Sequence, residues 1–363
     1  MRTRSQLRDI ASFAKGEQIN GDELISDGDY EYLNGGIAPS GKWNTSNVNG
    51  NTVTISEGGN SCGYVNYMRR PFWCGAHCYY LYDLRVDSEY LYFMLKSQQS
   101  RLMRIRTGAC MPNIKKVDLG KFVLEFDTDI RQQRGIVTIL KCIESIVQWR
   151  RHELQRLDEL IKARFVEMFG EPNSNSMGWP MRKLGDCLSS IDGGKSLNCD
   201  NHPRNGDFPA VLKLSAVTYG TYNPRENKQL PKASDFIEDL AVHAGDLLFS
   251  RKNTYELVGM AAYVWETPPF LMLPDLIFRL NTNGTCRKVY LWQLINHPQF
   301  RKVIRGLANG STGSMPNIAK QRLIEVSIPL PPVDRQIELE DFVSQVDKSK
   351  VVVQKWQEIT GFQ

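Results

Sequence analysis

The side chains best suited to metal binding lie close together in the first half of the chain. Cys74, His77 and Cys78, with Cys62 upstream, could supply thiolate and imidazole ligands to zinc. Their spacing matches no standard zinc finger, and the aromatic residues around them are typical of a buried strand. We therefore expect core cysteines and assign no residue to a metal.

Nucleotide chemistry and base chemistry would leave other signatures. Gly194-Lys195-Ser196 resembles the end of a phosphate-binding loop, but Ser189 stands where that loop requires its first glycine. The sequence lacks the Asn/Asp-Pro-Pro-Tyr/Phe segment with which amino-methyltransferases hold a flipped base, and it lacks a glycine-rich turn for S-adenosylmethionine. We therefore expect no catalytic residue in this chain.

The composition is that of an ordinary globular protein. Of the 363 residues, 41% are hydrophobic and 23% are charged, and the formal net charge is +5. This mildly basic balance permits a nucleic-acid partner without requiring one. The apolar runs are too short to cross a bilayer and the first residues lack the core of a signal peptide, so we expect a cytoplasmic protein with reduced, mostly structural cysteines.

Two distant segments carry the same tetrapeptide, Met-Pro-Asn-Ile, at Met111–Ile114 and Met315–Ile318. After each copy, alternating apolar residues are followed by an Arg-Gln pair at the start of a helix. At constant spacing, Arg131-Gln132 corresponds to Arg335-Gln336. An internal repeat of this kind predicts two units of the same fold.

Each copy has the pattern of a mixed α+β unit of roughly 130 to 150 residues, built of short strands, turns and a few short helices. Upstream of the tetrapeptides, Tyr90-Leu91 matches Tyr290-Leu291. The clearest expected strands are 51–56, 79–84, 246–250 and 276–280.

A long helix is predicted after each unit. In the first, no proline occurs from Arg131 to Phe169, and Gly170 ends the helix. Its apolar stripe comprises Leu140, Ile143, Val147, Leu154, Leu157 and Ile161; the stripe of the second helix comprises Leu339, Val343, Val346 and Val353. The helices, of about 39 and 29 residues, would span roughly 58 and 44 Å. We expect them to pair as an antiparallel coiled coil, although in the register above their stripes are out of phase by about one residue.

These features together resemble the specificity (S) subunit of type I restriction-modification enzymes. The likeness is carried by Gly313–Ile318, the strand ending Ile328–Pro332, and Arg335-Gln336, with Met111–Ile114 and Phe122–Phe126 in the first half. The resemblance implies two tandem target-recognition domains separated by an antiparallel two-helix coiled coil, with a pseudo-two-fold internal repeat. The implied boundaries are 1–128 and 177–332 for the recognition domains, 129–170 and 333–363 for the helices, and 171–176 for a linker.

The resemblance also implies a function. Such a chain is a non-catalytic subunit that reads a bipartite, asymmetric DNA target and directs adenine methylation, restriction or both. Two methyltransferase (M) subunits holding S-adenosylmethionine would dock on the coiled coil and the adjoining domains. Restriction motor-nuclease (R) subunits using ATP and Mg²⁺ would complete a restricting complex, and this chain itself would hold no cofactor. The rod would separate the two half-sites by about one helical turn, ~34 Å.

DNA contacts require cations and hydroxyls for phosphates, and side chains such as Arg and Asn for base edges. Turns between short strands supply the candidates: Asn34, Lys42, Trp43, Asn44, Arg69, Arg70 and Arg104 in the first unit, and Lys213, Ser215, Thr218, Tyr219, Arg251, Lys252, Asn253 and Arg305 in the second. For Met-Pro-Asn-Ile we favour a structural turn that delivers the next strand to the core, with a phosphate contact by its Asn as the alternative.

Two other functions stay open at this point. The chain could be a solitary DNA methyltransferase or nuclease with diverged motifs, in which case it would turn over substrate alone. It could instead be a scaffold whose coiled coil joins two protein-binding domains, in which case its affinity for duplex DNA would show little dependence on salt.

Overall fold

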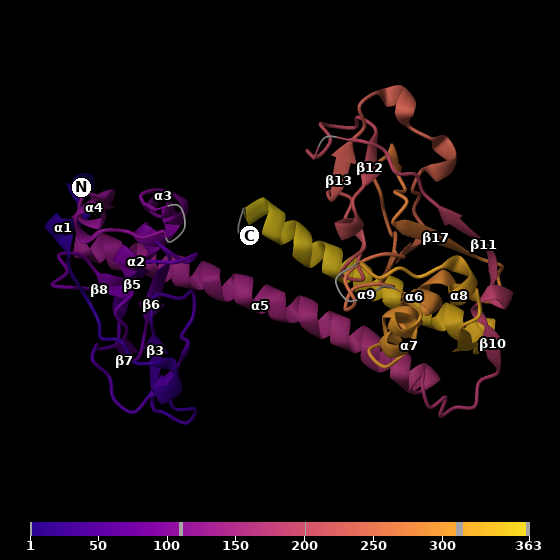
Figure 1. Cartoon of the computed structure of the whole chain (residues 1–363), viewed down its shortest axis with the longest axis horizontal. Helices are drawn as coiled ribbons and strands as arrows, with labels where there is room; N and C mark the ends of the chain where they lie inside the picture. Colours follow the sequence, from indigo (N-terminus) through magenta and orange to yellow (C-terminus); the bar gives the residue numbers. More distant parts are fainter. Residues whose placement is uncertain (1, 109–111, 200, 310–314, 361–363) are drawn as a thin grey trace. The chain divides into compact units, whose positions relative to one another are not determined.

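The chain forms two compact units, Met1–Gln148 and Trp149–Gln363. The computed structural model describes residues 2–108, 112–199, 201–309 and 315–360, with side chains described up to Lys350 (Figure 1). Helix α5 (Ile130–Phe169) begins in unit 1 and ends in unit 2. Among the described residues, no helix combines the length and the apolar character needed to cross a membrane.

Unit 1 contains three sheets. One pairs β1 with β9, a second has the antiparallel order β2-β8-β5-β6, and the third has the order β4-β3-β7, in which β3 and β7 are parallel. The strands are β1 (Arg2–Gln6), β2 (Ser12–Lys15), β3 (Tyr30–Leu33), β4 (Gly41–Trp43), β5 (Thr52–Ser56), β6 (Val65–Met68), β7 (Phe72–Cys74), β8 (Cys78–Tyr82) and β9 (Val123–Asp127). The short helices are α1 (Leu7–Ile10), α2 (Ser88–Ser97), α3 (Gln99–Arg104) and α4 (Lys116–Gly120).

Unit 2 repeats these sheets in the same order. Its strands pair as β10-β18, β11-β17-β14-β15 and β13-β12-β16, with β12 and β16 parallel. They are β10 (Met181–Lys183), β11 (Leu188–Gly193), β12 (Ala210–Leu212), β13 (Asn227–Gln229), β14 (Leu247–Ser250), β15 (Ala261–Tyr263), β16 (Leu271–Met272), β17 (Ile277–Thr282) and β18 (Ser327–Pro329). The helices are α6 (Lys288–Asn296), α7 (Phe300–Gly306), α8 (Lys320–Ile324) and α9 (Val333–Thr360).

The matching sheet orders confirm the predicted repeat, and two tyrosines mark equivalent places in it. Tyr90, in α2, accepts a hydrogen bond at its hydroxyl from the backbone N–H of Asp127 at 3.2 Å. Tyr290, in α6, donates its hydroxyl to the carbonyl of Pro329 at 2.6 Å. Each hydroxyl thus links a helix, α2 in unit 1 and α6 in unit 2, to the last strand of its unit.

The four expected strands are confirmed as β5, β8, β14 and β17, with ends shifted by one or two residues. All four residues of β14 are buried because both faces of its sheet are covered. Leu247 and Phe249 point into the core shared with the helices, while Leu248 points into the core shared with the three-stranded sheet. This alternation follows from the two-residue period of a strand.

The end of α5 and the start of α9 pack together within unit 2 (Figure 1). Two ion pairs fix their direction: Arg164 Nη2 lies 2.8 Å from Glu338 Oε1, and Lys350 pairs with Asp158. Because the partner number on α9 rises as the number on α5 falls, the helices run antiparallel, as expected. Gly170 ends α5 in the left-handed region, at a φ of 74°.

The predicted coiled-coil residues are not all buried to the same degree. Ile161, Leu339, Val343 and Val346 are buried in one hydrophobic cluster of unit 2, with the half-buried Leu157 against it. The other stripe positions of α5 are half-buried: Leu140, Ile143, Val147 and Leu154. The side chain of Val353 lies outside the described residues.

The pairing of Gln132 with Gln336 is wrong by one residue. The structure equates Gln336 with Gln133, since both are fully buried at the start of a long helix, while Gln132 is exposed. The connection between the last strand and the helix is one residue longer in unit 1, so a constant spacing fails there. In the corrected register Leu140 matches Val343 and Ile143 matches Val346, which removes the phase difference between the stripes.

The expectation of core cysteines is confirmed. Cys62 is fully buried in the core beneath the helices of unit 1. Cys74 and Cys78 are buried in a separate cluster with Leu33 and Phe72, between the two larger sheets. These thiols therefore serve as small apolar side chains in the packing of unit 1.

Candidate DNA interface

In each unit, loops from distant parts of the sequence meet at the end of one strand, β5 in unit 1 and β14 in unit 2. We call this region of each unit its strand-end surface. It comprises Asn34–Gly36, Glu57–Ser61, His77 and Asn113 in unit 1, and Lys213–Tyr219, Arg251–Tyr255 and Asn317 in unit 2. In unit 1, Asn34 Oδ1 accepts the backbone N–H of His77 at 3.1 Å, and Ser61 Oγ donates to the carbonyl of Gly35 at 2.6 Å. In unit 2, Asn253 Nδ2 donates to Thr218 Oγ1 at 3.2 Å and so joins two of the predicted loops.

The asparagine of Met-Pro-Asn-Ile holds the strand-end surface together in both units. Asn113 exchanges backbone hydrogen bonds with Thr107, and Asn317 does the same with Asn309, at 2.9 to 3.0 Å. The isoleucine that follows is fully buried in each copy. These contacts confirm the structural turn; Met111 lies outside the described residues.

Position 57 of unit 1 corresponds to position 251 of unit 2, and the two carry opposite charges. The backbone N–H of Glu57 donates to the carbonyl of His77 at 2.9 Å, and that of Arg251 donates to Leu276 at 3.1 Å. Asn113 Nδ2 donates to Glu57 Oε1 at 3.4 Å, whereas Asn317 Oδ1 accepts from Arg251 Nε at 3.0 Å. The repeated asparagine therefore orients a carboxylate in one unit and a guanidinium in the other.

The carboxylate of Glu57 is compensated within unit 1. It is 6% exposed, it pairs with Lys15, and His77 Nδ1 lies 3.7 Å from Oε2. Burial, followed by the charge of Glu57, raises the pKa of Tyr79 to about 12. The Tyr79 hydroxyl therefore stays protonated at neutral pH and donates to the carbonyl of Ile114 at 3.1 Å.

Cations and aromatic rings predominate on the strand-end surface of unit 2. The Arg251 guanidinium carbon lies 4.9 Å from the centroid of the Phe278 ring, and Lys320 Nζ lies 5.4 Å from the same ring. Tyr219 and Tyr255 are 75% and 58% exposed. Cations can contact phosphates and guanine, and exposed rings can stack on unpaired bases. This arrangement suits a nucleic-acid ligand.

The structure does not bring the predicted DNA-binding residues of unit 1 together. Asn34 lies on the strand-end surface, with its amide used to hold the loop. Lys42 and Trp43 lie on β4 opposite the start of β3, with Asn44 following, and Trp43 packs edge-on against Trp73 at 6.2 Å.

The arginines of the same set lie elsewhere in unit 1. Arg69 and Arg70 follow β6, which runs antiparallel to β5, so they lie at the start of β5 rather than at its end. Arg69 also pairs with Glu89 at 3.2 Å. Arg104 is exposed on α3. The sequence does not show in which direction neighbouring strands run, so these arginines could not be distinguished from residues at the other end of β5.

In unit 2 the predicted residues lie closer together, but several are occupied by other protein groups. Thr218 and Asn253 are 7% and 6% exposed, so we revise their expected role from DNA contact to positioning of the loop. Ser215 Oγ donates to Glu226 Oε2 at 2.6 Å, and Lys213 Nζ lies 3.8 Å from the same oxygen. Arg305 pairs with Glu256.

The remaining predicted residues of unit 2 are better placed to meet a ligand. Tyr219 is largely exposed, and Arg251 and Lys252 are half-buried at the end of β14. Glu57, the counterpart of Arg251, was missed by the sequence analysis. Only an alignment of the two copies through Ser56 and Ser250, which end equivalent strands, would have pointed to Glu57.

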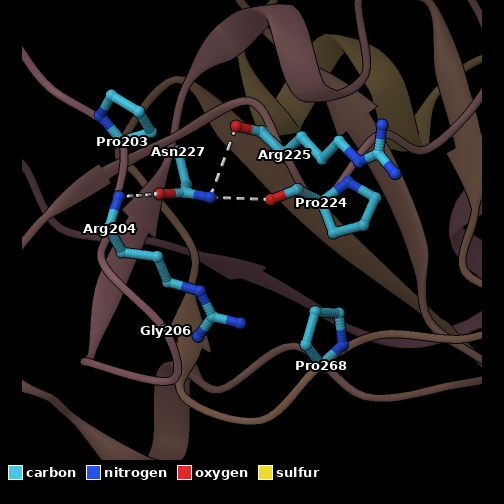
Figure 2. A pocket seen from close by; sticks show the side chains of 7 residues that line it. All are labelled: Pro203, Arg204, Gly206, Pro224, Arg225, Asn227 and Pro268. Carbon is cyan, nitrogen blue, oxygen red and sulfur yellow. Dashed lines mark hydrogen bonds between the residues drawn. The ribbon is translucent and has the colours of Figure 1, made fainter. Parts of the chain in front are cut away.

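A second basic site, beside β12 and β13, was also missed. A pocket of about 310 Å³ is lined by Arg204, Arg225, Asn227 and neighbouring proline and glycine residues. Figure 2 shows the amide of Asn227 between the backbones of the two arginines: Oδ1 accepts the N–H of Arg204 at 2.9 Å, and Nδ2 donates to the carbonyl of Pro224 at 2.8 Å. The side chain of Arg204 is 8% exposed, and its Nη1 donates to the carbonyl of Pro269 at 2.7 Å.

Several proteins of known family are similar to this chain. A protein of Mycoplasma pneumoniae named as a type I specificity subunit, S.MpnORF638P, is 29% identical over 219 residues, which cover 57% of this chain and 58% of that protein. The EcoEI type I restriction enzyme specificity subunit of Escherichia coli is 29% identical over 194 residues, covering 52% of this chain and 33% of that protein. The matches thus span less than two thirds of these relatives.

The fold is similar to that of a solved S subunit. The crystal structure of the type I restriction-modification S subunit from M. genitalium aligns with a TM-score of 0.63 at 18% identity, covering 99% of this chain and 94% of that one. The family described as the type I restriction modification DNA specificity domain matches residues 3–159 and 177–360, which is nearly the whole chain. The chain therefore belongs to the type I restriction-modification DNA specificity family.

Proposed function

We propose that this chain binds double-stranded DNA and reads a bipartite, asymmetric target for catalytic partner subunits. The observation that carries the proposal is the pairing of a repeated fold with non-repeated side chains at the strand-end surface. In unit 2 the repeated asparagine orients the guanidinium of Arg251, which can donate twice to guanine. In unit 1 it orients the buried carboxylate of Glu57, beside which the exposed imidazole of His77 lies. Two units with such different groups would prefer different half-sites.

The proposed DNA contacts follow from exposure and charge. In unit 2 we assign Arg251 and Lys252 to base edges or phosphates and Tyr219 to stacking or a phosphate contact. In unit 1 we assign Asn34 and His77 on the strand-end surface, with Lys42, Arg70 and Arg104 as additional phosphate contacts. Glu57, which is 6% exposed, would position the side chain of His77. The segments 1–128 and 177–332 would act as the two target-recognition domains.

The chemistry would be done by partner subunits. Two methyltransferase subunits carrying S-adenosylmethionine would dock on the α5–α9 pair and the adjoining domain surfaces and methylate adenine. Restriction motor-nuclease subunits would supply ATP- and Mg²⁺-dependent cleavage. We place the complex in the cytoplasm, where bacterial DNA is accessible to it.

The direct test is methylation mapping. The chain would be expressed with its methyltransferase subunit in a host free of adenine methylation, and modified adenines would be located by single-molecule sequencing. We expect one motif with two different half-sites and a fixed spacer. A palindromic motif, or methylation by the methyltransferase subunit without this chain, would contradict the proposal.

A binding titration tests the DNA contact itself. The affinity for random duplex should fall linearly on a logarithmic scale as salt rises, with a slope of about 0.9 for each phosphate neutralised. A scaffold that joins two protein-binding domains would give weak binding with little salt dependence.

A further inference from the structure

Unit 2 contains a pocket of about 560 Å³ whose lining comes from α5, α9 and the aromatic residues of β15, α6 and the loops beside them. Three of its aromatic rings contact one another: Tyr263 lies 4.6 Å from Trp265 and 6.1 Å from Trp292, measured between ring centroids. The Nε1 donor of Trp265 is buried and has no hydrogen-bond partner among the described residues. Aromatic side chains therefore form part of the pocket wall.

Acidic side chains also line this pocket. Asp158, Glu266 and Asp347 all contribute to it, and Lys350 pairs with Asp158. Burial raises the pKa of Asp347; Lys350 opposes this shift, and Glu266 and Asp158 add to it. One further cation, Lys162, is exposed at the lining. The lining therefore carries three carboxylates and two lysines.

The internal repeat shows what occupies the equivalent place in unit 1. Tyr67 pairs with Val53 across β5 and β6 as Tyr263 pairs with Leu247 across β14 and β15, so the two tyrosines are equivalent. Tyr92 follows Tyr90 by the same interval by which Trp292 follows Tyr290. The rings of Tyr67 and Tyr92 lie 5.6 Å apart, so both units keep this aromatic pair.

Unit 1 covers its aromatic pair with an arginine of its own. The guanidinium carbon of Arg69 lies 5.8 Å from the Tyr67 ring centroid, and its Nη1 lies 3.2 Å from Glu89. In unit 2 the positions of Arg69 and Arg70 are taken by Trp265 and Glu266. Where unit 1 has two cations, unit 2 thus has a third aromatic ring and a carboxylate, and Asp347 on α9 adds a further acidic side chain.

We propose that the unit 2 pocket receives the guanidinium group of an arginine carried by a protein partner. A cation over Tyr or Trp faces is stabilised by the negative ring faces, and a carboxylate can bind guanidinium through two hydrogen bonds. DNA phosphate would be repelled by Glu266 and Asp347, so the pocket takes a different ligand from the strand-end surface, which it adjoins at Tyr219. The partner assignment rests on the proposed function: it is an arginine-bearing segment of the methyltransferase subunit.

The ligand chemistry can be tested without DNA or a partner. The full chain would be labelled with 5-fluorotryptophan, and the ¹⁹F resonances of Trp265 and Trp292 would be assigned with Phe variants. Argininamide should shift both resonances in a saturable way, whereas citrullinamide, which has the same length and no charge, should not. Equal shifts with both compounds, or none with argininamide, would overturn the proposal.

Variants locate the site. Asp347→Asn and Glu266→Gln should each weaken argininamide binding several-fold. Glu325→Gln should leave it unchanged, because Glu325 is an exposed carboxylate that pairs with Lys183 and does not line the pocket. Trp265→Arg restores the residue type of unit 1 and should abolish binding by filling the pocket from within. A Trp265→Arg variant that keeps its near-ultraviolet circular dichroism and still binds argininamide at the original affinity would refute the site.

The assignment of the methyltransferase subunit as the partner is tested separately, by measuring subunit association. Asp347→Asn should weaken association with the methyltransferase subunit about tenfold, measured by titration calorimetry, and leave the methylated motif unchanged. Argininamide binding with undiminished subunit association would overturn the partner assignment. Failure of the proposed function is distinct, because it would appear as absent or palindromic methylation with the argininamide result intact.

Discussion

Gln133 and Gln336 make the same pair of buried hydrogen bonds at the starts of α5 and α9. Gln133 Oε1 accepts the N–H of Asp87 at 2.8 Å, and its Nε2 donates to the carbonyl of Asp127 at 2.6 Å. Gln336 Oε1 accepts the N–H of Arg287 at 2.7 Å, and its Nε2 donates to Pro331 at 2.7 Å. Gln133 thus joins α5 to the last strand of unit 1 and to the start of α2, and Gln336 joins α9 to the segment after β18 and to the start of α6.

Replacing Gln336 with Ala should destabilise unit 2 by about 1–3 kcal/mol, because two buried backbone groups would lose their partners. Urea denaturation followed by circular dichroism measures the change. Gln132→Ala is the matched control, since that side chain is exposed and should alter stability by less than about 0.5 kcal/mol. A loss for Gln132→Ala as large as that for Gln336→Ala would contradict the corrected register.

The α5–α9 contact should depend on Leu339 far more than on Leu160. Leu339 is fully buried in the cluster that also contains Ile161 and Phe165, so Leu339→Ala should cost about 2–5 kcal/mol. Leu160, on the same stretch of α5, is 48% exposed, and Leu160→Ala should be nearly neutral. Thermal unfolding of both variants compares them. Similar losses would show that the helix pair is not packed as described.

Arg251→Ala should relax the sequence preference of one half-site and leave the other intact. Loss of a guanidinium that donates twice to guanine removes about 1–3 kcal/mol of discrimination. Methylation mapping with the variant gives the result directly. Arg182→Ala, which removes an exposed arginine from β10, should leave the motif unchanged. An unaltered motif with Arg251→Ala would exclude this arginine from recognition.

Stability should fall on mild acidification because of His297. Burial lowers the pKa of its imidazole below the ordinary value of 6.5; Glu171 opposes this shift, and Lys162 adds to it. The folded state therefore favours the neutral ring, which lies 5.7 Å from Phe165, and its contribution is present above pH 6.5 and is lost as the pH falls toward the folded pKa.

His297→Asn should flatten this part of the pH dependence between about pH 7.5 and pH 5.5. The measurement is the urea midpoint at a series of pH values. His152→Asn is the control, because His152 is exposed on α5 and its removal should preserve the slope. An unchanged slope in the His297 variant would show that another group titrates in this range.

The sequence was sufficient to identify the repeat and the long helices. The duplicated Met-Pro-Asn-Ile and the proline-free apolar stripe ending at Gly170 depend on local chemistry: turn geometry, helix termination and a seven-residue period. The strands ending at Ser56 and Ser250 were equally visible, because their apolar residues are continuous or alternate. These features are written in neighbouring residues, so they can be recognised without knowing what packs where.

The grouping of the recognition residues was decided by the tertiary structure. Arg69 and Asn34 look alike in the sequence as polar residues of turns, but β6 and β5 run in opposite directions, so Arg69 lies at the start of β5 and Asn34 at its end. The equivalence of Glu57 and Arg251 could likewise be recognised only from the pairing of β5 with β8 and of β14 with β17. When equivalent loops of a repeat carry different side chains, the sequence shows no similarity between them. Only the fold then specifies which positions correspond.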